Sequence, residues 1–226
     1  MTNALIVGAG SGLSASLARL LSSEGFAVHL VARDTGKLSA LAEETGASLH
    51  RADAADGTAV SRIVDGIDGR LDIAVYNPSA RERGPIAELD PEKVRRALEV
   101  TAYGAFLMGQ AAARRMLGQD GEVKGTILFT GASAGVKGFA RSASFAMGKF
   151  AQRGLAQAMA RELHPEGVHV AWVNIDGAIL LPERSEDVPG SKLHPDEIAR
   201  AYLGLHRQHR STWSNELTIR PWVETF

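Results

Sequence analysis

The sequence predicts an α/β fold in which helices cover both faces of a parallel sheet, and three observations lead to this prediction. Short apolar runs alternate with longer amphipathic stretches along the 226 residues. Several of the short runs are apolar at every position, as strands buried on both faces are. The 24 glycines stand mostly singly between these segments, where tight turns are needed. Because strand–helix alternation implies right-handed βαβ units, we expect one doubly wound, seven-stranded sheet in a single domain covering residues 1–226.

The elements of this fold are recognised by their length and periodicity. The expected strands are Ala4–Val7, Ala27–Val31, Ser48–Arg51, Ile73–Tyr76, Thr126–Thr130, Val168–Asn174 and Glu216–Ile219. Apolar residues recur at helical spacing in the segments Leu13–Ser23, Lys37–Glu44, Ala59–Ile67, Pro91–Leu117 and Ser142–His164. The segment Leu181–Pro195 interrupts the alternation with three prolines, a glycine and several charges. Such a segment is either solvated surface or a lid over the crevice at the strand ends, and we expect a lid.

Composition excludes several classes of protein. The 25 Lys+Arg nearly balance the 26 Asp+Glu, so no excess charge favours nucleic acid or a membrane surface as a partner. The chain has no cysteine, and His164, His169 and His194 do not pair with a second ligand, so we expect no metal site. No apolar run approaches the ~20 residues of a membrane span. The first strand also lacks the basic flank of a secretory signal, so we expect a cytoplasmic protein.

A glycine loop follows the first strand and precedes the first helix. It reads Gly8-Ala9-Gly10-Ser11-Gly12-Leu13. Glycines there allow a tight turn and a close approach of the backbone to a phosphate, while the helix offers free N–H groups and the positive end of its dipole. A purely structural turn is the alternative. The position of the loop between a strand and a helix favours a dinucleotide-binding site that includes Gly8, Gly10, Ser11, Gly12 and Leu13.

The end of the second strand indicates which dinucleotide binds. A site selective for NAD carries a carboxylate about 20 residues past the glycines, where it binds the ribose 2′-hydroxyl. Ala32 stands at that place and Arg33 follows it. A guanidinium suits a 2′-phosphate, which it grips with two hydrogen bonds. Asp34 is an alternative ribose ligand, but we interpret it as the N-cap of a helix over Thr35–Thr45. We therefore expect NADP(H) rather than NAD(H).

With these features the chain resembles the short-chain dehydrogenase/reductase family, which has a Rossmann fold, over essentially its whole length. The loop from Gly8 resembles the family's TGxxxGxG motif, with Val7 at its Thr and Ser14 at its last Gly. Asn77 matches the first residue of the family's Asn-Asn-Ala-Gly motif, and Asp176 stands at the proline of its Pro-Gly turn. The resemblance implies further cofactor contacts from Asp53, Ala54, Asn77, Lys149, Gly177 and Ile179.

The resemblance also implies a departure from the family at the reacting centre. The family uses Asn, Ser, Tyr and Lys, and the matching positions hold Thr101, Ala132, Phe145 and Lys149. Phenylalanine has no O–H, so it neither donates nor accepts a proton. Lys149 is retained, and Phe145 is otherwise interpreted as a core aromatic near the nicotinamide.

Four nearby hydroxyls are candidate substitutes for the missing ones. Ser142 and Ser144 precede Phe145, but a serine hydroxyl is a poor acid at neutral pH. Ser133 follows Ala132 directly, although the next residue along a strand end usually points elsewhere. Tyr103 lies two positions after Thr101 on a helix, so it faces away and is expected to pack or to form an interface.

Three functions follow. We favour an atypical NADP(H)-dependent oxidoreductase acting on an unidentified small carbonyl, alcohol or activated double bond, with the proton supplied by water. The second is a non-catalytic NADP(H)-binding sensor or regulatory protein. The third is a structural subunit that pairs with an active homologue. The helices Pro91–Leu117 and Ser142–His164 resemble the family's dimer-forming bundle, so a homodimer or homotetramer is expected.

Overall fold

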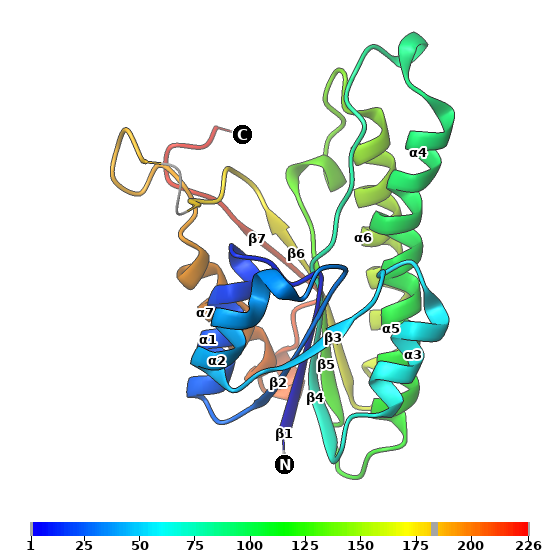
Figure 1. Ribbon diagram of the computed structural model, residues 1–226, viewed down its shortest axis with the longest axis vertical. Helices are drawn as coiled ribbons and strands as arrows, with labels where there is room; N and C mark the ends of the chain where they lie inside the picture. Colours follow the sequence, from blue (N-terminus) through cyan, green and yellow to red (C-terminus); the bar gives the residue numbers. More distant parts are fainter. Residues whose placement is uncertain (1, 182–184, 226) are drawn as a thin grey trace.

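The protein, analysed as a computed structural model that describes residues 2–181 and 185–225, forms three layers (Figure 1). In this part of the chain a seven-stranded sheet runs in the order β3-β2-β1-β4-β5-β6-β7. Neighbouring strands are parallel throughout. The predicted fold class, a doubly wound parallel sheet, is confirmed.

The strands lie where the sequence predicts them, several with one to three additional residues. They are β1 (Thr2–Val7), β2 (Ala27–Ala32), β3 (Ser48–Arg51), β4 (Arg70–Tyr76), β5 (Gly125–Thr130), β6 (Val168–Ile175) and β7 (Glu216–Ile219). Strands β5 and β6 are buried at every position. This explains their continuous apolar sequence, because helices cover both of their faces.

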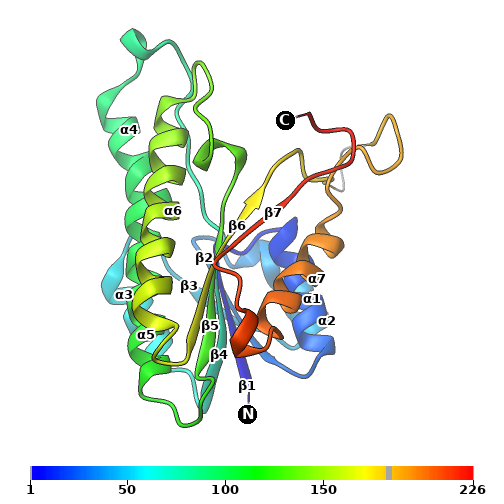
Figure 2. The same ribbon diagram turned by 180° about the vertical axis from the view of Figure 1, so that it is seen from behind.

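Two helical layers sandwich the sheet (Figures 1 and 2). One face is covered by α1 (Leu13–Ser23), α2 (Ser39–Thr45) and α7 (Pro195–His206), and the other by α3 (Gly57–Asp65), α5 (Gly104–Leu117) and α6 (Ala143–Leu163). The helix α4 (Pro91–Leu98) packs on α6, and both reach beyond the carboxyl ends of the strands (Figure 2). None of the helices in the described part of the chain has both the length and the apolar character needed to cross a bilayer.

The predicted helix over Pro91–Leu117 is interrupted by a π-helical stretch, Glu99–Tyr103. The Tyr76 hydroxyl donates to the carbonyl of Val100. A Cβ on Gly104 would lie 2.2 Å from that hydroxyl oxygen, so only glycine lets the helix pass so close. We attribute the wider turn to this insertion of a side chain into the backbone ladder.

Two other sequence predictions need correction. The helix α7 was not predicted, although Pro195 at its first turn and the acidic Asp196 and Glu197 are typical of a helix start. The prediction that Asp34 is the N-cap of the next helix is wrong, because α2 begins five residues later. Its Oδ1 accepts from the N–H of Gly36 at 3.1 Å, so it closes a turn ahead of a short 3₁₀ segment, and α2 begins only at Ser39.

The strand order reverses at β1, which places the ligand crevice. The chain moves outward from β1 to β3 and then returns to β4 on the other side of β1. Loops that leave the ends of β1 and β4 therefore separate to opposite faces, and a crevice opens between them. Gly8 follows β1 directly and Asn77 follows β4, and both line this crevice.

Candidate functional site

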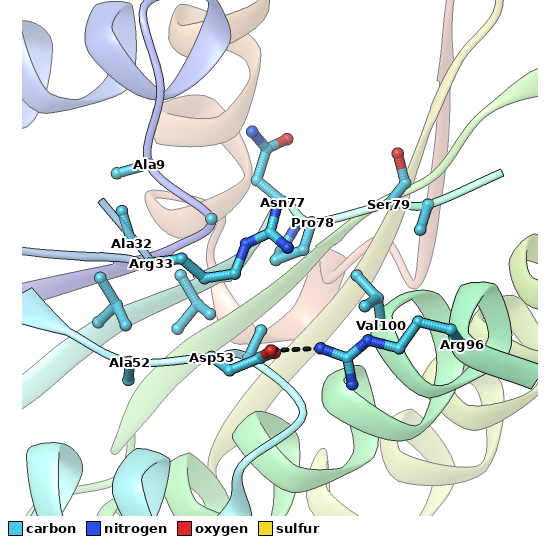
Figure 3. A pocket seen from close by; sticks show the side chains of 15 residues that line it. Ala9, Ala32, Arg33, Ala52, Asp53, Asn77, Pro78, Ser79, Arg96 and Val100 are labelled. Carbon is cyan, nitrogen blue, oxygen red and sulfur yellow. Dashed lines mark hydrogen bonds and ion pairs between the residues drawn. The ribbon is translucent and has the colours of Figure 1, made fainter. Parts of the chain in front are cut away.

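Two cavities adjoin along the carboxyl ends of the strands. The first, of about 450 Å³, lies at the ends of β1 to β4 (Figure 3). The second, of about 730 Å³, lies at the ends of β5 and β6 and beside the start of α6. Asn77 and Ser79 line both cavities, so the segment after β4 forms their common wall. We call them the first and the second cavity below.

The glycine loop is fixed by a close backbone contact and by a serine. Gly8 has a φ of 82°, and a Cβ there would lie 2.5 Å from Cγ of Pro78. The Ser14 hydroxyl donates to the carbonyl of Gly8 at 3.1 Å and accepts from Nδ2 of Asn77 at 2.8 Å. Ser14 therefore ties the loop after β1 to the end of β4.

The residues from Gly10 to Leu13 do not line either cavity. Space is open around Gly10, where a Cβ would meet nothing within 4 Å. Leu181, which lines the second cavity, lies against Gly12, and a Cβ on Gly12 would be 3.2 Å from its Cδ2. Leu13 is buried in the core. No described side chain caps the start of α1; the N–H of Ala15 donates to the carbonyl of Gly12 at 2.9 Å, and the N–H groups ahead of it face the glycine loop, where an anion is favoured.

The first cavity holds a carboxylate and two guanidinium groups. Asp53 accepts from the N–H of Ala55 at 3.0 Å and forms an ion pair with Arg96 (Figure 3). Burial alone would raise the pKa of Asp53, but the hydrogen bond from Ala55 and the charge of Arg96 outweigh it, and the pKa lies below its usual value. Arg33 extends into the cavity toward Asn77 and forms no ion pair with any described residue. Ala54 also lines this cavity.

The second cavity brings together most of the residues predicted to surround the reacting atoms. They are Ala132, Ser133, Phe145, Lys149, Gly177 and Ile179. The expectation that Ser133 points elsewhere is wrong in one respect, because Ser133 and Ala132 both line the cavity. The strand β5 ends at Thr130, and the chain then turns into a 3₁₀ segment, so the alternation of a strand no longer applies.

Lys149 is buried beneath the second cavity. Its side chain is 2% exposed, and Nζ donates to the carbonyl of Thr130 at 2.5 Å and to Oε1 of Gln152 at 3.4 Å. Burial, and then the positive charge of Arg81, lower the pKa of Lys149 to about 7. The lysine is therefore divided between ammonium and amine near neutral pH.

Thr101 is buried and lines neither cavity. Its hydroxyl accepts from the N–H of Ala80 at 2.9 Å and donates to the carbonyl of the same residue at 3.2 Å. It therefore holds the segment after β4 in place. Tyr103 is 54% exposed and stacks with Phe106 away from the cavities, as expected from its position two residues after Thr101.

The turn after β6 is held by an ion pair and by a glycine. Gly177 has a φ of 152°, and a Cβ there would lie 2.7 Å from Cδ of Pro221. Asp176 pairs with Arg220 at 3.1 Å. Ile179 then forms a β-bridge with Leu193, which ties the two ends of the expected lid together.

The expected lid, residues 181–195, is only partly described, and residues 182–184 lie outside the described chain. In the described part, Glu186 accepts from the N–H groups of Gly190 and Lys192, both at 3.0 Å. These bonds close the loop on itself.

Sequence reasoning missed several residues of the two cavities. Arg81 and Arg83 line the second cavity, and Arg96 lines the first. The guanidinium carbon of Arg81 lies 4.2 Å from the centre of the Phe145 ring. The two arginines had a signal in the sequence, because positions two apart after a strand end share a side if the chain stays extended. Arg96 had none, because it meets Asp53 across 43 positions of sequence.

Comparison with known proteins identifies the family. Residues 2–179 match the family model described as short chain dehydrogenase. The chain belongs to the short chain dehydrogenase family.

Two named relatives are similar to this chain over more than four fifths of its length. The 3-dehydrosphinganine reductase TSC10B of Arabidopsis thaliana is 30% identical over 82% of this chain, which spans 55% of that relative's length. The sorbitol-6-phosphate 2-dehydrogenase of Escherichia coli is 28% identical over 88% of this chain and 82% of the relative.

Solved short chain dehydrogenases share the whole fold. One from Rhodopseudomonas palustris is 33% identical with a TM-score of 0.84 and covers 98% of this chain and 99% of its own. A metagenomic short-chain oxidoreductase in complex with NADP is 26% identical with a TM-score of 0.84, and the matches cover 99% and 98%. BdcA in complex with NADPH is 26% identical with a TM-score of 0.83, and the matches cover 97% and 93%.

Proposed function

We propose that this chain is an NADP(H)-dependent oxidoreductase that acts on a small carbonyl compound, its alcohol or an activated double bond. The observation that carries the proposal is that the first and the second cavity adjoin at Asn77, so that a nucleotide in the first would reach the second, above Lys149. Family membership supports hydride chemistry, and two solved relatives hold NADP or NADPH. D-Threitol dehydrogenase of Mycolicibacterium smegmatis, 29% identical, and sorbitol-6-phosphate 2-dehydrogenase support an alcohol or carbonyl as the reacting group.

The residues of the first cavity fit the nucleotide. Open space around Gly10 and the uncapped start of α1 suit a pyrophosphate. Arg33 is the described guanidinium of this cavity without an ion pair, which suits a 2′-phosphate. The proposed contacts are Gly8, Gly10, Ser11, Gly12 and Leu13 for the phosphates, Asp53 and Ala54 for the adenine, and Asn77, Lys149, Gly177 and Ile179 toward the nicotinamide. When bound, NADP(H) supplies or takes up a hydride.

The proton side of the reaction is altered. We propose that Phe145 and Ala132 stand where the family has its tyrosine and serine, and Thr101 where it has its asparagine. A positioned acid contributes roughly 10²–10⁴-fold and an oxyanion donor roughly 10²–10³-fold to a rate, so the chain is slow on ordinary ketones. Lys149, with a pKa lowered to about 7, is partly protonated near neutral pH beneath the cavity, and Ser133 lines the cavity. Solvent supplies the proton to the product.

A nucleotide titration followed by a substrate panel tests this function. NADPH and NADH are titrated while tryptophan fluorescence is recorded, and NADPH consumption is then followed with ketones, aldehydes, enones and cyclic imines. We expect NADPH to bind at least roughly 10-fold more tightly than NADH and one of the activated acceptors to be reduced. Failure of NADPH to bind contradicts the proposal.

The second candidate function is a non-catalytic NADP(H) sensor, and the missing hydroxyls at Phe145 and Ala132 favour it. Tight NADPH binding with no turnover of any acceptor would favour the sensor. The variant Phe145→Tyr/Ala132→Ser separates the two candidates further, because it should raise reductase activity on simple carbonyls by at least about 10-fold. The control is Phe26→Tyr, which adds the same hydroxyl at a position outside both cavities and away from α5 and α6. An equal gain of reductase activity in the control would show that the missing hydroxyls at Phe145 and Ala132 do not limit the rate.

We also propose a homo-oligomer built on α5 and α6. Large apolar side chains on this side are exposed, namely Tyr103, Phe106, Met147 and Phe150. The variant Phe106→Glu/Phe150→Glu should shift the mass measured by light scattering from a dimer or tetramer to a monomer. A wild-type monomer contradicts this proposal.

A further inference from the structure

We propose that the second cavity binds the anionic group of the substrate, a carboxylate or a phosphate, between Arg81 and Arg83. The inference rests on the proposed function and narrows it: the substrate is a small carbonyl compound or alcohol that carries a negative charge.

The ionisable side chains described in the lining of the second cavity are all basic. Its described lining contains Arg81, Arg83 and Lys149 and no aspartate or glutamate. Neither arginine forms an ion pair with a described carboxylate. Glu82, which lies between them in sequence, pairs instead with Lys93 of α4 at 3.5 Å. Among the described residues, therefore, no carboxylate neutralises the two arginines by an ion pair.

Two buried hydroxyls hold the segment that carries the arginines. The Thr101 hydroxyl bonds to both the N–H and the carbonyl of Ala80. The Ser144 hydroxyl does the same for Glu82, at 2.9 Å in each case. Both hydroxyl residues are fully buried. These bonds fix the backbone at residues 80 and 82, and the side chains of the alternate residues Arg81 and Arg83 both line the cavity.

Phe145 gives Arg81 a fixed platform. The guanidinium carbon lies 4.2 Å from the ring centre, a distance typical of a cation–π contact. A guanidinium that stacks through its face keeps its edge N–H groups available, and these match the two oxygens of a carboxylate or phosphate. Arg81 also contributes, after burial, to the lowered pKa of Lys149, so the two cations interact across the cavity. An anion between the arginines relieves this repulsion.

The phosphates of the nucleotide are not the expected occupants of this site. The glycine loop and Arg33 belong to the first cavity or its edge, on the other side of the wall formed by Asn77 and Ser79. Arg81 and Arg83 line the second cavity and not the first. The anion they bind is therefore expected to be present together with the nucleotide.

Calorimetric titration of the full chain saturated with NADP⁺ tests the inference, because the oxidised nucleotide cannot reduce the probes. Two pairs of carbonyl probes differ in charge: 4-oxopentanoate with its methyl ester, and dihydroxyacetone phosphate with dihydroxyacetone. We expect one anionic probe to bind roughly 10-fold or more tightly than its neutral partner and to weaken with added salt. The first pair reports a carboxylate site and the second a phosphate site.

Arginine variants identify the residues responsible. Arg81→Gln and Arg83→Gln should each weaken the anionic probe by roughly 5- to 20-fold and leave the neutral probe unchanged. The matched control is Arg62→Gln, which removes the same charge from an exposed position of α3 outside both cavities and should leave binding unchanged. Equal binding of charged and neutral probes, or unaltered binding in both cavity variants, overturns the inference.

Nucleotide titrations keep this inference separate from the proposed function. Arg81→Gln and Arg83→Gln should bind NADP⁺ as the wild type does, and competition between anion and NADP⁺ would overturn the inference by assigning the arginines to the nucleotide. If NADP⁺ does not bind the wild-type chain, the proposed function fails. In that case the probes are titrated into the chain without nucleotide, and the anion site is accepted or rejected by the same comparison of charged with neutral probes.

Discussion

The two cavities of this protein are neighbours in space but differ in how their charges are arranged. In the first, the carboxylate of Asp53 meets the guanidinium of Arg96, and Arg33 remains without a described ion pair. In the second, Arg81, Arg83 and Lys149 face a lining that contains no described carboxylate. The first cavity therefore has its charges mostly paired within the protein, whereas the second leaves them for a ligand.

The cavities also differ in what shapes them. Backbone geometry shapes the first, through the left-handed Gly8 against Pro78 and the loop ends of β1 and β4. Side chains from separate elements shape the second, where Phe145 of α6 supports Arg81 from the segment after β4. The shape of the first cavity therefore depends on the backbone of the fold, whereas that of the second depends on a few side chains. Four predictions test this comparison, from the largest effect to the smallest.

Gly8→Ala should disturb the first cavity most. The new Cβ would lie 2.5 Å from Pro78, at a backbone φ of 82°. We expect a loss of roughly 2–5 kcal/mol in the free energy of unfolding, measured by urea denaturation, because steric overlap and a left-handed conformation both add cost. Gly10→Ala is the control, since a Cβ there meets nothing within 4 Å and should leave stability almost unchanged. Equal losses would show that the contact with Pro78 is not what requires glycine.

Lys149 should make stability depend on pH. Its pKa is lowered to about 7 in the folded chain, against about 10.4 in an unfolded one, so the unfolded state binds more protons between these values. The free energy of unfolding should therefore rise with pH from about 7 to about 10, by a few kcal/mol. Urea denaturation of the wild type and of Lys149→Met at pH 6, 7, 8 and 9 isolates this contribution.

The difference between those two proteins is the measured quantity, because other groups titrate in both. A difference that does not change with pH would mean that Lys149 has an ordinary pKa, and that burial and the charge of Arg81 do not destabilise its ammonium form.

Arg33→Ala should separate the two nucleotides. If the guanidinium binds the 2′-phosphate, NADPH binding weakens by roughly 10- to 100-fold while NADH binding changes little. Fluorescence titration of both nucleotides provides the measurement. An equal loss for NADPH and NADH would argue against this role of Arg33 and would leave the first cavity without selectivity.

Arg96→Gln should have the smallest effect. Arg96 pairs with Asp53 and, at 3.2 Å, with Glu99, and the three side chains are 46%, 33% and 30% exposed, so removing both pairs should cost no more than about 1 kcal/mol in stability. The pKa of Asp53 should rise toward its ordinary value, because the charge of Arg96 helps to lower it. Carboxyl chemical shifts followed by NMR against pH would check this, and an unchanged titration of Asp53 would contradict the pairing.

Much of the fold was predictable from local sequence. The apolar runs of β5 and β6 and the glycine loop after β1 are determined by burial and backbone conformation, which act on neighbouring residues. The π-helical stretch at Glu99–Tyr103 was not predictable, because its cause is the hydroxyl of Tyr76, which comes from another element. The helix α7 was missed because the charged segment before it obscured a recognisable helix start.

By itself, the sequence determined the parallel sheet, the glycine turn after β1 and the absence of hydroxyls at Phe145 and Ala132. Each follows from the identity of a residue and of its close neighbours in the chain. The tertiary structure alone decided that Arg96 meets Asp53 and that Arg81, between backbone groups held by Thr101 and Ser144, contacts Phe145. The physical reason is that hydrogen bonds and charge–ring contacts act over a few ångströms of space, and folding brings together groups that the chain keeps far apart.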